Sequence, residues 1–248
     1  MPPHLLKLDT TPDLVEQVYR RLLDAISQGT LAPSQRITQE EIAAQLSVSR
    51  QPVHQAFRQL KKDGFVLDAP GRGVLVAPLD SDLLLKVYQV RGALDALAAR
   101  LAAEKFFRID PELIANGRKA AKGKDVMAMI DADMAFHQAI YEASGNDLIA
   151  QASSQHWYHL RRTMGAVLQQ SRQRGALWDE HERIADAIAA GRGDLAAQLI
   201  EEHAAQASKN LAARLDQVIT AGQLKAQAPD TTTSTPHSRR HFNRRRQA

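Results

Sequence analysis

Residues 38–76 read TQEEIAAQLSVSRQPVHQAFRQLKKDGFVLDAPGRGVLV, and this stretch decides the fold of the N-terminal part of the chain. Thr38 and Glu41 have the spacing of a capping box, which predicts the start of a short helix. A second helix is predicted over 50–62, capped by Ser49, and it carries four basic residues and no acidic one. Two short apolar runs then flank a turn rich in glycine and proline, which indicates a hairpin. A short capped helix packed on a basic helix, with a hairpin behind it, is typical of proteins that enter the major groove of DNA.

The length and composition of the chain bound the remaining possibilities. A chain of 248 residues favours two domains, or one large domain, and 44% hydrophobic residues support a real core. No uninterrupted apolar run approaches the length of a membrane span, and the N-terminus lacks the ordered basic and apolar blocks of a signal peptide. The absence of cysteine excludes disulfides, thiolate metal sites and cysteine nucleophiles. We expect a soluble, cytoplasmic protein.

The net charge of +4 is misleading, because it belongs to the C-terminal tail. Residues 225–248 contain one lysine, five arginines and a single acid, so the rest of the chain is close to neutral with one excess negative charge. The prediction of DNA binding therefore depends on where the basic residues lie and not on the overall charge.

The organisation along the chain predicts a mainly α protein in three parts. A DNA-binding domain is expected over 1–79, with a first helix that begins near Pro12. An all-helical bundle is expected over 80–222, and a disordered basic tail over 223–248. Breaks at glycine and proline divide the bundle into helices near 82–105, 111–121, 125–143, 147–170, 176–190 and 194–219.

Four side chains that can bind metal ions lie on the apolar faces of three predicted helices. Asp133 and His137 are four residues apart on the 125–143 helix, and His181 and His203 share stripes with apolar residues of their own helices. Taken singly, each is better explained as a hydrogen-bonded core residue. Burying a carboxylate and three imidazoles without partners is costly, however, and one divalent ion would satisfy all four together. The set therefore predicts a site for a Zn, Ni or Mn-like ion.

Two further polar residues face inward and are candidates for binding a ligand. Arg91 lies among apolar residues of its helix, where it either pairs with Asp95 or Glu104 or offers a planar fork to a carboxylate beside the metal. His156 also faces inward and is a second candidate for lining the same cavity, although core packing is the better explanation of its position.

Two other functional classes have to be weighed. A metal held by three histidines and an aspartate can activate water, so a metal-dependent enzyme acting on a small carboxylic acid is the alternative. The sequence has no HExxH motif, nucleophile elbow or phosphate-binding loop, and four protein ligands suit the binding of a chelating molecule better than turnover. A nucleic-acid-binding protein driven by the arginine tail is the third possibility. We favour a sensor that is not an enzyme.

The chain resembles the GntR family of bacterial transcription regulators, in the FadR-type branch that carries an FCD domain. The N-terminal resemblance rests on short segments between about residues 12 and 77, namely 18–22, 31–33, 42–46, 48–53, 63–66 and 71–73. The C-terminal resemblance, over about 82–220, rests on Arg91 with Asp95, on 133–137, and on His181 and His203. The resemblance implies a winged helix-turn-helix, a homodimer on a palindromic operator in double-stranded DNA, and a divalent metal ion that helps to hold a small organic acid.

The sequence departs from the family pattern at a few positions. Serine stands at 34 and 47, where the family usually has glycine, and His54-Gln55 stands where it usually has Arg-Glu in the reading helix. A shorter and weakly charged side chain at 54 leads us to expect a weaker salt dependence of DNA binding or a variant operator, and not a loss of binding. The residues expected to face DNA are Arg50, His54, Arg58, Arg72 and Gly73. Together these features predict a metabolite-responsive transcription regulator, a repressor, whose effector is a small carboxylate.

Overall fold

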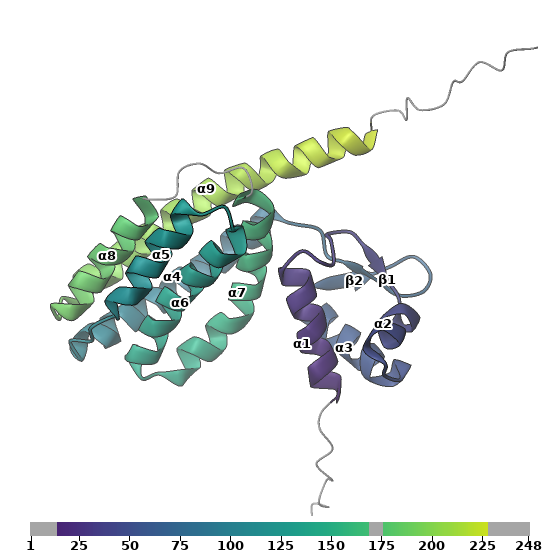
Figure 1. Cartoon of the computed structure of the whole chain (residues 1–248), viewed down its shortest axis with the longest axis horizontal. Coiled ribbons are helices and arrows are strands. Elements are labelled where there is room, and N and C mark those ends of the chain that lie inside the picture. The colour runs from purple at the N-terminus through teal and green to yellow at the C-terminus, as the bar shows by residue number, and fades with distance from the viewer. Residues whose placement is uncertain (1–13, 169–175, 228–248) are drawn as a thin grey trace, which may run out of the picture.

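The computed structural model describes residues 14–168 and 176–227, which form two parts that lie side by side (Figure 1). The first part consists of α1 (Leu14–Ser27), β1 (Arg36–Ile37), α2 (Gln39–Leu46), α3 (Arg50–Lys62), β2 (Val66–Asp68) and β3 (Val74–Val76). The second consists of α4 (Ser81–Glu104), α5 (Pro111–Lys122), α6 (Val126–Ser144), α7 (Asp147–Val167), α8 (Ala176–Ala189) and α9 (Gly193–Gln227). The mainly helical fold, with a winged helix-turn-helix followed by an all-α bundle, is therefore confirmed.

The helix-turn-helix begins as the sequence predicts. The Thr38 hydroxyl accepts a hydrogen bond from the Glu41 amide, and the Glu41 carboxylate accepts one from the Thr38 amide, which is a complete capping box. Ser49 is the N-cap residue of α3 by position, but its side chain makes no capping hydrogen bond. Ser34 and Ser47 both have positive φ, 63° and 54°. These are conformations that glycine adopts at lower cost, so the two serines carry local backbone strain.

The wing is a three-stranded antiparallel sheet with strand order β1-β3-β2. The sequence predicts its hairpin but not the two-residue strand β1, which pairs Arg36 with Leu75 and Ile37 with Val74. Gly73 has φ of +89°, and a Cβ atom there would lie 2.3 Å from the carbonyl oxygen of Ile37. Glycine at 73 therefore allows β1 and β3 to come together.

The bundle is built around the long helices α4 and α9, which pack against each other. A Cβ atom on Gly92 would lie 3.6 Å from that of Ala204, and one on Gly193 would lie 3.2 Å from the side chain of Arg100. Because the residue numbers rise on one helix as they fall on the other, the two helices are antiparallel. Aspartate or asparagine caps the start of four helices of the bundle, at Asp80, Asp110, Asp125 and Asn146.

Two helix boundaries differ from the predicted ones. Helix α7 ends at Val167, three residues before the predicted end at 170. Helix α9 continues to Gln227, past the predicted end at 219 and past the boundary placed at 222. A single glycine costs a helix only about 1 kcal/mol, and Ala, Gln, Leu and Lys on either side favour the helix, so Gly222 does not end it. The predicted helix start near Pro12 and most of the predicted disordered tail lie outside the described residues.

Helix α7 is the part of the bundle that packs against the DNA-binding domain, where it contacts α1 (Figure 1). Tyr158 of α7 packs against the core of the DNA-binding domain, and His159 contacts Phe65 and Asp63. Within the described ranges, no helix is both long and apolar enough to cross a membrane.

Candidate metal centre and DNA-binding face

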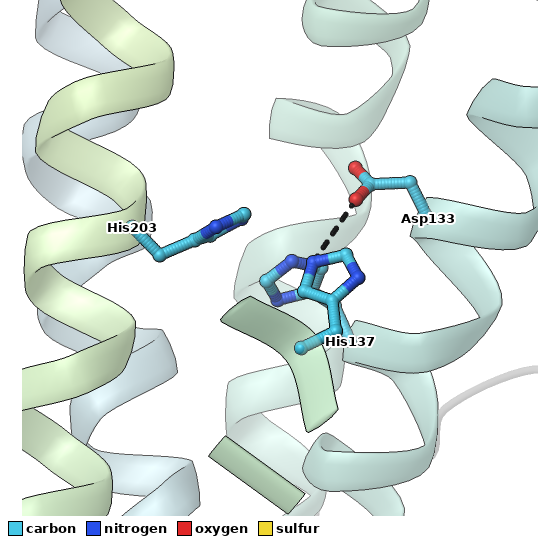
Figure 2. Close-up of side chains that lie close together, drawn as sticks. Asp133, His137 and His203 are labelled. Carbon is cyan, nitrogen blue, oxygen red and sulfur yellow. Dashed lines mark ion pairs between the residues drawn. The ribbon is translucent and has the colours of Figure 1, made fainter. Parts of the chain in front are cut away.

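The four predicted metal ligands come together inside the bundle. Asp133 and His137 project from α6, His181 from α8 and His203 from α9, and one ligand atom of each lies within 4.8 Å of the others. All four side chains are buried. Figure 2 shows His203 approaching from α9 toward Asp133 and His137 on α6. Asp133 Oδ1 lies 3.3 Å from His181 Nε2.

Several buried polar atoms of this cluster have no hydrogen-bond partner in the described part of the protein. Among the described residues, neither ring nitrogen of His137 or His181 has a hydrogen-bond partner, and nor does Asp133 Oδ1. Burial lowers the pKa of both histidines well below its usual value, so each ring is neutral and offers the lone pair of one of its nitrogens. Burial also raises the pKa of Asp133, which Arg91 opposes. Two neutral imidazoles, the imidazole of His203 and one carboxylate, gathered within reach of one another, fit a divalent transition metal ion.

A second carboxylate organises the side of the cluster that faces α4. Asp95 Oδ2 lies 3.2 Å from Arg91 Nε and 3.4 Å from His137 Nδ1, and Asp95 Oδ1 accepts a hydrogen bond from the Tyr141 hydroxyl. Of the two partners predicted for Arg91, Asp95 is therefore the correct one. Burial, the largest single effect, lowers the pKa of Arg91, but the neighbouring Asp95, Tyr141, Tyr88 and Asp133 together outweigh it and leave the pKa raised, so the guanidinium remains charged.

A third carboxylate holds His203. Glu180 Oε2 lies 2.8 Å from His203 Nδ1, and this hydrogen bond lowers the pKa of Glu180. The helical periodicity of the sequence does not predict this contact, because Glu180 lies off the inward stripe of its helix. Glu180 directly precedes His181 and is one-third exposed, so only the packing of α8 against α9 brings it to His203.

The cluster opens into a cavity of about 590 Å³ between α4, α6, α7, α8 and α9. Arg91, Asp133 and His203 line its inner end together with Tyr88. His156 does not line it: the side chain is half-buried, and neighbouring Trp157 occupies the position against Arg91, with its ring centre 4.1 Å from the guanidinium carbon. Arg91 is therefore placed to meet a ligand, and the role suggested for His156 has no geometric support from this cavity.

The predicted DNA-binding residues lie on an exposed surface of the N-terminal domain. Arg50, His54 and Arg58 are exposed on α3, on the side opposite its buried apolar residues, and Arg72 is exposed on the wing. Arg50 Nη1 lies 3.1 Å from Glu40 Oε1. The Arg36 side chain donates hydrogen bonds to the carbonyl oxygen of Arg72, which holds the turn between β2 and β3 against β1.

A winged helix-turn-helix with an exposed basic helix, joined to an all-helical bundle, defines a class of DNA-binding transcription regulators. Comparison with known proteins agrees. Residues 14–76 match the gntR family of bacterial regulatory proteins, and residues 86–206 match the FCD domain. The chain belongs to the GntR family of transcription regulators, in the branch with an FCD domain.

The chain is similar to several regulators in sequence and structure. It is 29% identical over 202 residues to a probable D-xylose utilization operon transcriptional repressor of Paenarthrobacter nicotinovorans, which covers 79% of this chain and 88% of that protein. It is 30% identical over 199 residues to the HTH-type transcriptional regulator LutR of Bacillus subtilis, with 68% and 87% covered. A putative GntR regulator from Rhodococcus sp. RHA1 superimposes with a TM-score of 0.65 at 26% identity over 79% of this chain and 96% of the other. The fold is also that of E. coli McbR/YncC (TM-score 0.69, 22% identity, 80% and 96% covered).

Proposed function

We propose that the protein is a metabolite-responsive repressor that acts in the cytoplasm, and that a small carboxylate held in a metal-containing pocket controls its binding to a palindromic operator. The observation that carries this proposal is the set of four buried, mutually close metal ligands at the end of a cavity, in a chain that also presents an exposed basic reading helix. The two relatives named above, a probable operon repressor and an HTH-type transcriptional regulator, support the same role.

In this proposal Asp133, His137, His181 and His203 hold the ion. Bound there, a divalent cation supplies a Lewis-acidic centre to which a carboxylate oxygen can coordinate. Counted by formal charge, the buried Arg91 stands against two buried aspartates, Asp95 and Asp133, so these side chains together carry one excess negative charge. A bound divalent cation changes this sum to one excess positive charge. The unpaired Nη2 of Arg91 is then a second donor for the same carboxylate.

The carboxylates of Asp95 and Glu180 have a positioning role in this proposal. Each faces the Nδ1 atom of a histidine, His137 and His203 respectively, at 3.4 and 2.8 Å. A carboxylate on Nδ1 fixes the ring and leaves Nε2 as the lone-pair donor toward the metal.

The proposed dimer can be placed on the outer face of α4. Leu83, Val90 and Leu97 are spaced by seven residues and are 36%, 51% and 40% exposed, with half-buried Leu94 beside them. A heptad stripe of this kind on a long helix suits packing against the same helix of a second copy. Two reading helices related by a twofold axis would then meet the two halves of a palindrome.

The test begins with DNA selected from a random-sequence library by the full-length protein. His137→Ala and His203→Ala are expected to lower the metal content measured by elemental analysis, and Arg50→Ala to weaken binding to the selected DNA. A thermal-shift screen of small carboxylic acids, run with and without chelator, is expected to find acids that stabilise only the metal-loaded protein. Unchanged metal content in both histidine variants would show that the proposed site is wrong.

A further inference from the structure

The cavity extends well beyond the metal cluster, along one side of α9. His203 lies at its inner end, and Gln206, Asn210 and Arg214 follow on the same stripe of the helix and also line the cavity. Arg214 lies eleven positions after His203, which corresponds to about 16 Å along a helix axis. Because Gly92 packs beside Ala204, Arg91 lies at the level of His203. The two arginines of the cavity therefore lie at opposite ends of it.

Arg214 is half-buried and lines the cavity, unlike the exposed arginines Arg108, Arg183 and Arg192 of the bundle. Arg100, Arg118 and Arg161 each pair with an aspartate or glutamate at 2.7 to 3.1 Å. Within the described part of the chain, no carboxylate lies within ion-pair distance of Arg214, which is half-buried in the cavity wall. The two carboxylates that line the cavity, Asp133 and Glu180, are both engaged at the metal cluster. The far end of the cavity therefore holds a positive charge without a partner from these residues.

The wall between the two ends is largely apolar. Most of the residues that line it are apolar, among them Met129, Ile130, Met164, Leu168, Trp178 and Leu211. A cavity of about 590 Å³ is within the range of sites for drug-sized ligands and much larger than an acid of two or three carbons needs.

We propose that Arg214 forms a second anion-binding end of the cavity, and that the ligand class is an elongated acid with two anionic groups joined by a mostly apolar chain. This inference rests on the proposed function, because the first carboxylate is the one placed at the metal and Arg91. The second anionic group meets Arg214 beside Asn210, and the chain between them lies against the methionine and leucine side chains. A short diacid cannot reach both ends.

The experiment measures binding to the full-length, zinc-loaded protein by calorimetry, with matched pairs of acids of equal chain length. The diacids malonate, glutarate, pimelate and azelate are compared with propionate, pentanoate, heptanoate and nonanoate. We expect a longer diacid to bind about tenfold more tightly than its monoacid, as for one charge-assisted hydrogen bond that is partly exposed to solvent. Malonate should show no advantage that depends on Arg214. Arg214→Gln should abolish the advantage, whereas Lys209→Gln, which removes one charge from the exposed side of the same helix, should not.

The outcomes separate the two proposals. If monoacids bind in a metal-dependent way but no diacid gains from Arg214, the second anion-binding end is wrong and the proposed acid sensor stands. If no acid of either series binds the zinc-loaded protein, both proposals are wrong. An advantage that appears only at one chain length and disappears in Arg214→Gln supports both and gives the length of the ligand.

Discussion

The imidazole ring of His159 stacks on the phenyl ring of Phe65, with ring centres 4.1 Å apart and planes within 12° of parallel. His159 belongs to α7 of the bundle, and Phe65 follows the reading helix α3. His159 Nε2 also lies 3.2 Å from the carbonyl oxygen of Asp63, the C-cap residue of α3. Two residues earlier on α7, Trp157 covers the guanidinium of Arg91. One helix thus contacts both the inner end of the cavity and the end of the reading helix.

This arrangement predicts that α7 carries the effect of the ligand to DNA. A ligand that draws Arg91 toward the metal changes the surface on which Trp157 packs, and α7 would transmit that shift to the α3 end through His159. We expect His159→Ala to bind selected DNA within about threefold of wild type but to lose most of the ligand-induced change in affinity, which is typically 5- to 150-fold in coupled systems. Fluorescence anisotropy with and without the best-binding acid measures both quantities.

The control for this variant is Gln155→Ala, an exposed position on the same helix. It should leave the ligand effect intact. A full ligand effect in His159→Ala would show that the coupling runs by another route, for example through the linker between β3 and α4.

The same histidine predicts a pH dependence of stability. Burial lowers the pKa of His159 to about 4, from an ordinary value near 6.5. The unfolded chain therefore takes up a proton at this residue as the pH falls below about 6.5, while the folded chain does not. Its stabilising contribution is complete above that pH and is lost between about 6.5 and 4, at a slope of at most about 1.4 kcal/mol per pH unit.

Chemical denaturation of metal-free protein at several pH values tests this sign. Wild type should lose stability more steeply than His159→Phe between pH 6.5 and 5, because phenylalanine can keep the stacking on Phe65 without titrating. Equal slopes for the two proteins would mean that His159 is not protonated preferentially on unfolding.

Much of the fold follows from local sequence signals, and the exceptions have physical reasons. The capping box at Thr38 and the breaks between the helices of the bundle depend on neighbouring residues, so they are visible in the sequence. Strand β1 depends on pairing with β3, about 40 residues away, and its two residues give no periodic pattern of their own. The positive φ angles of Ser34 and Ser47 are set by the turns around them and not by the residue type.

In the candidate site, too, some residues are predicted from local sequence patterns and others are brought together only by the packing of helices. Each metal ligand is predicted from the period of its own helix, because a helix buries one face wherever it packs. Glu180 lies off the inward stripe of α8 and reaches His203 only through the packing of two helices. His156 is predicted to line the cavity and does not, for a related reason. It lies beside the buried stripe of α7, and the larger Trp157 fills the space at Arg91.

Close packing at Gly117 predicts a strong effect of a single methyl group. A Cβ atom there would lie 1.9 Å from Cζ2 of Trp178, a buried ring that also packs edge-on against His181. Gly117→Ala is expected to lower the free energy of unfolding by about 1–3 kcal/mol and to weaken metal binding by displacing the Trp178 ring. Gly165→Ala is the matched control, since its Cβ would meet only Met127 Sδ at 4.0 Å and helix propensity favours alanine. Denaturant titration of both variants distinguishes crowding at Trp178 from a general effect of adding a methyl group.

The carboxylates behind the histidines predict a loss of metal affinity without the loss of a ligand. In Glu180→Gln the amide keeps the size of the side chain but no longer offers a negative charge to His203 Nδ1, and Asp95→Asn does the same at His137. Each variant is expected to bind Zn²⁺ about 10- to 100-fold more weakly in competition with a chelating dye. Asp95→Asn also leaves Arg91 without its buried partner and should destabilise the fold, so Glu180→Gln, at the rim, is the cleaner measurement. Glu182→Gln, which only removes an exposed ion pair with Arg118, should bind zinc like wild type. Wild-type affinity in Glu180→Gln would mean that this contact does not orient His203 toward the metal.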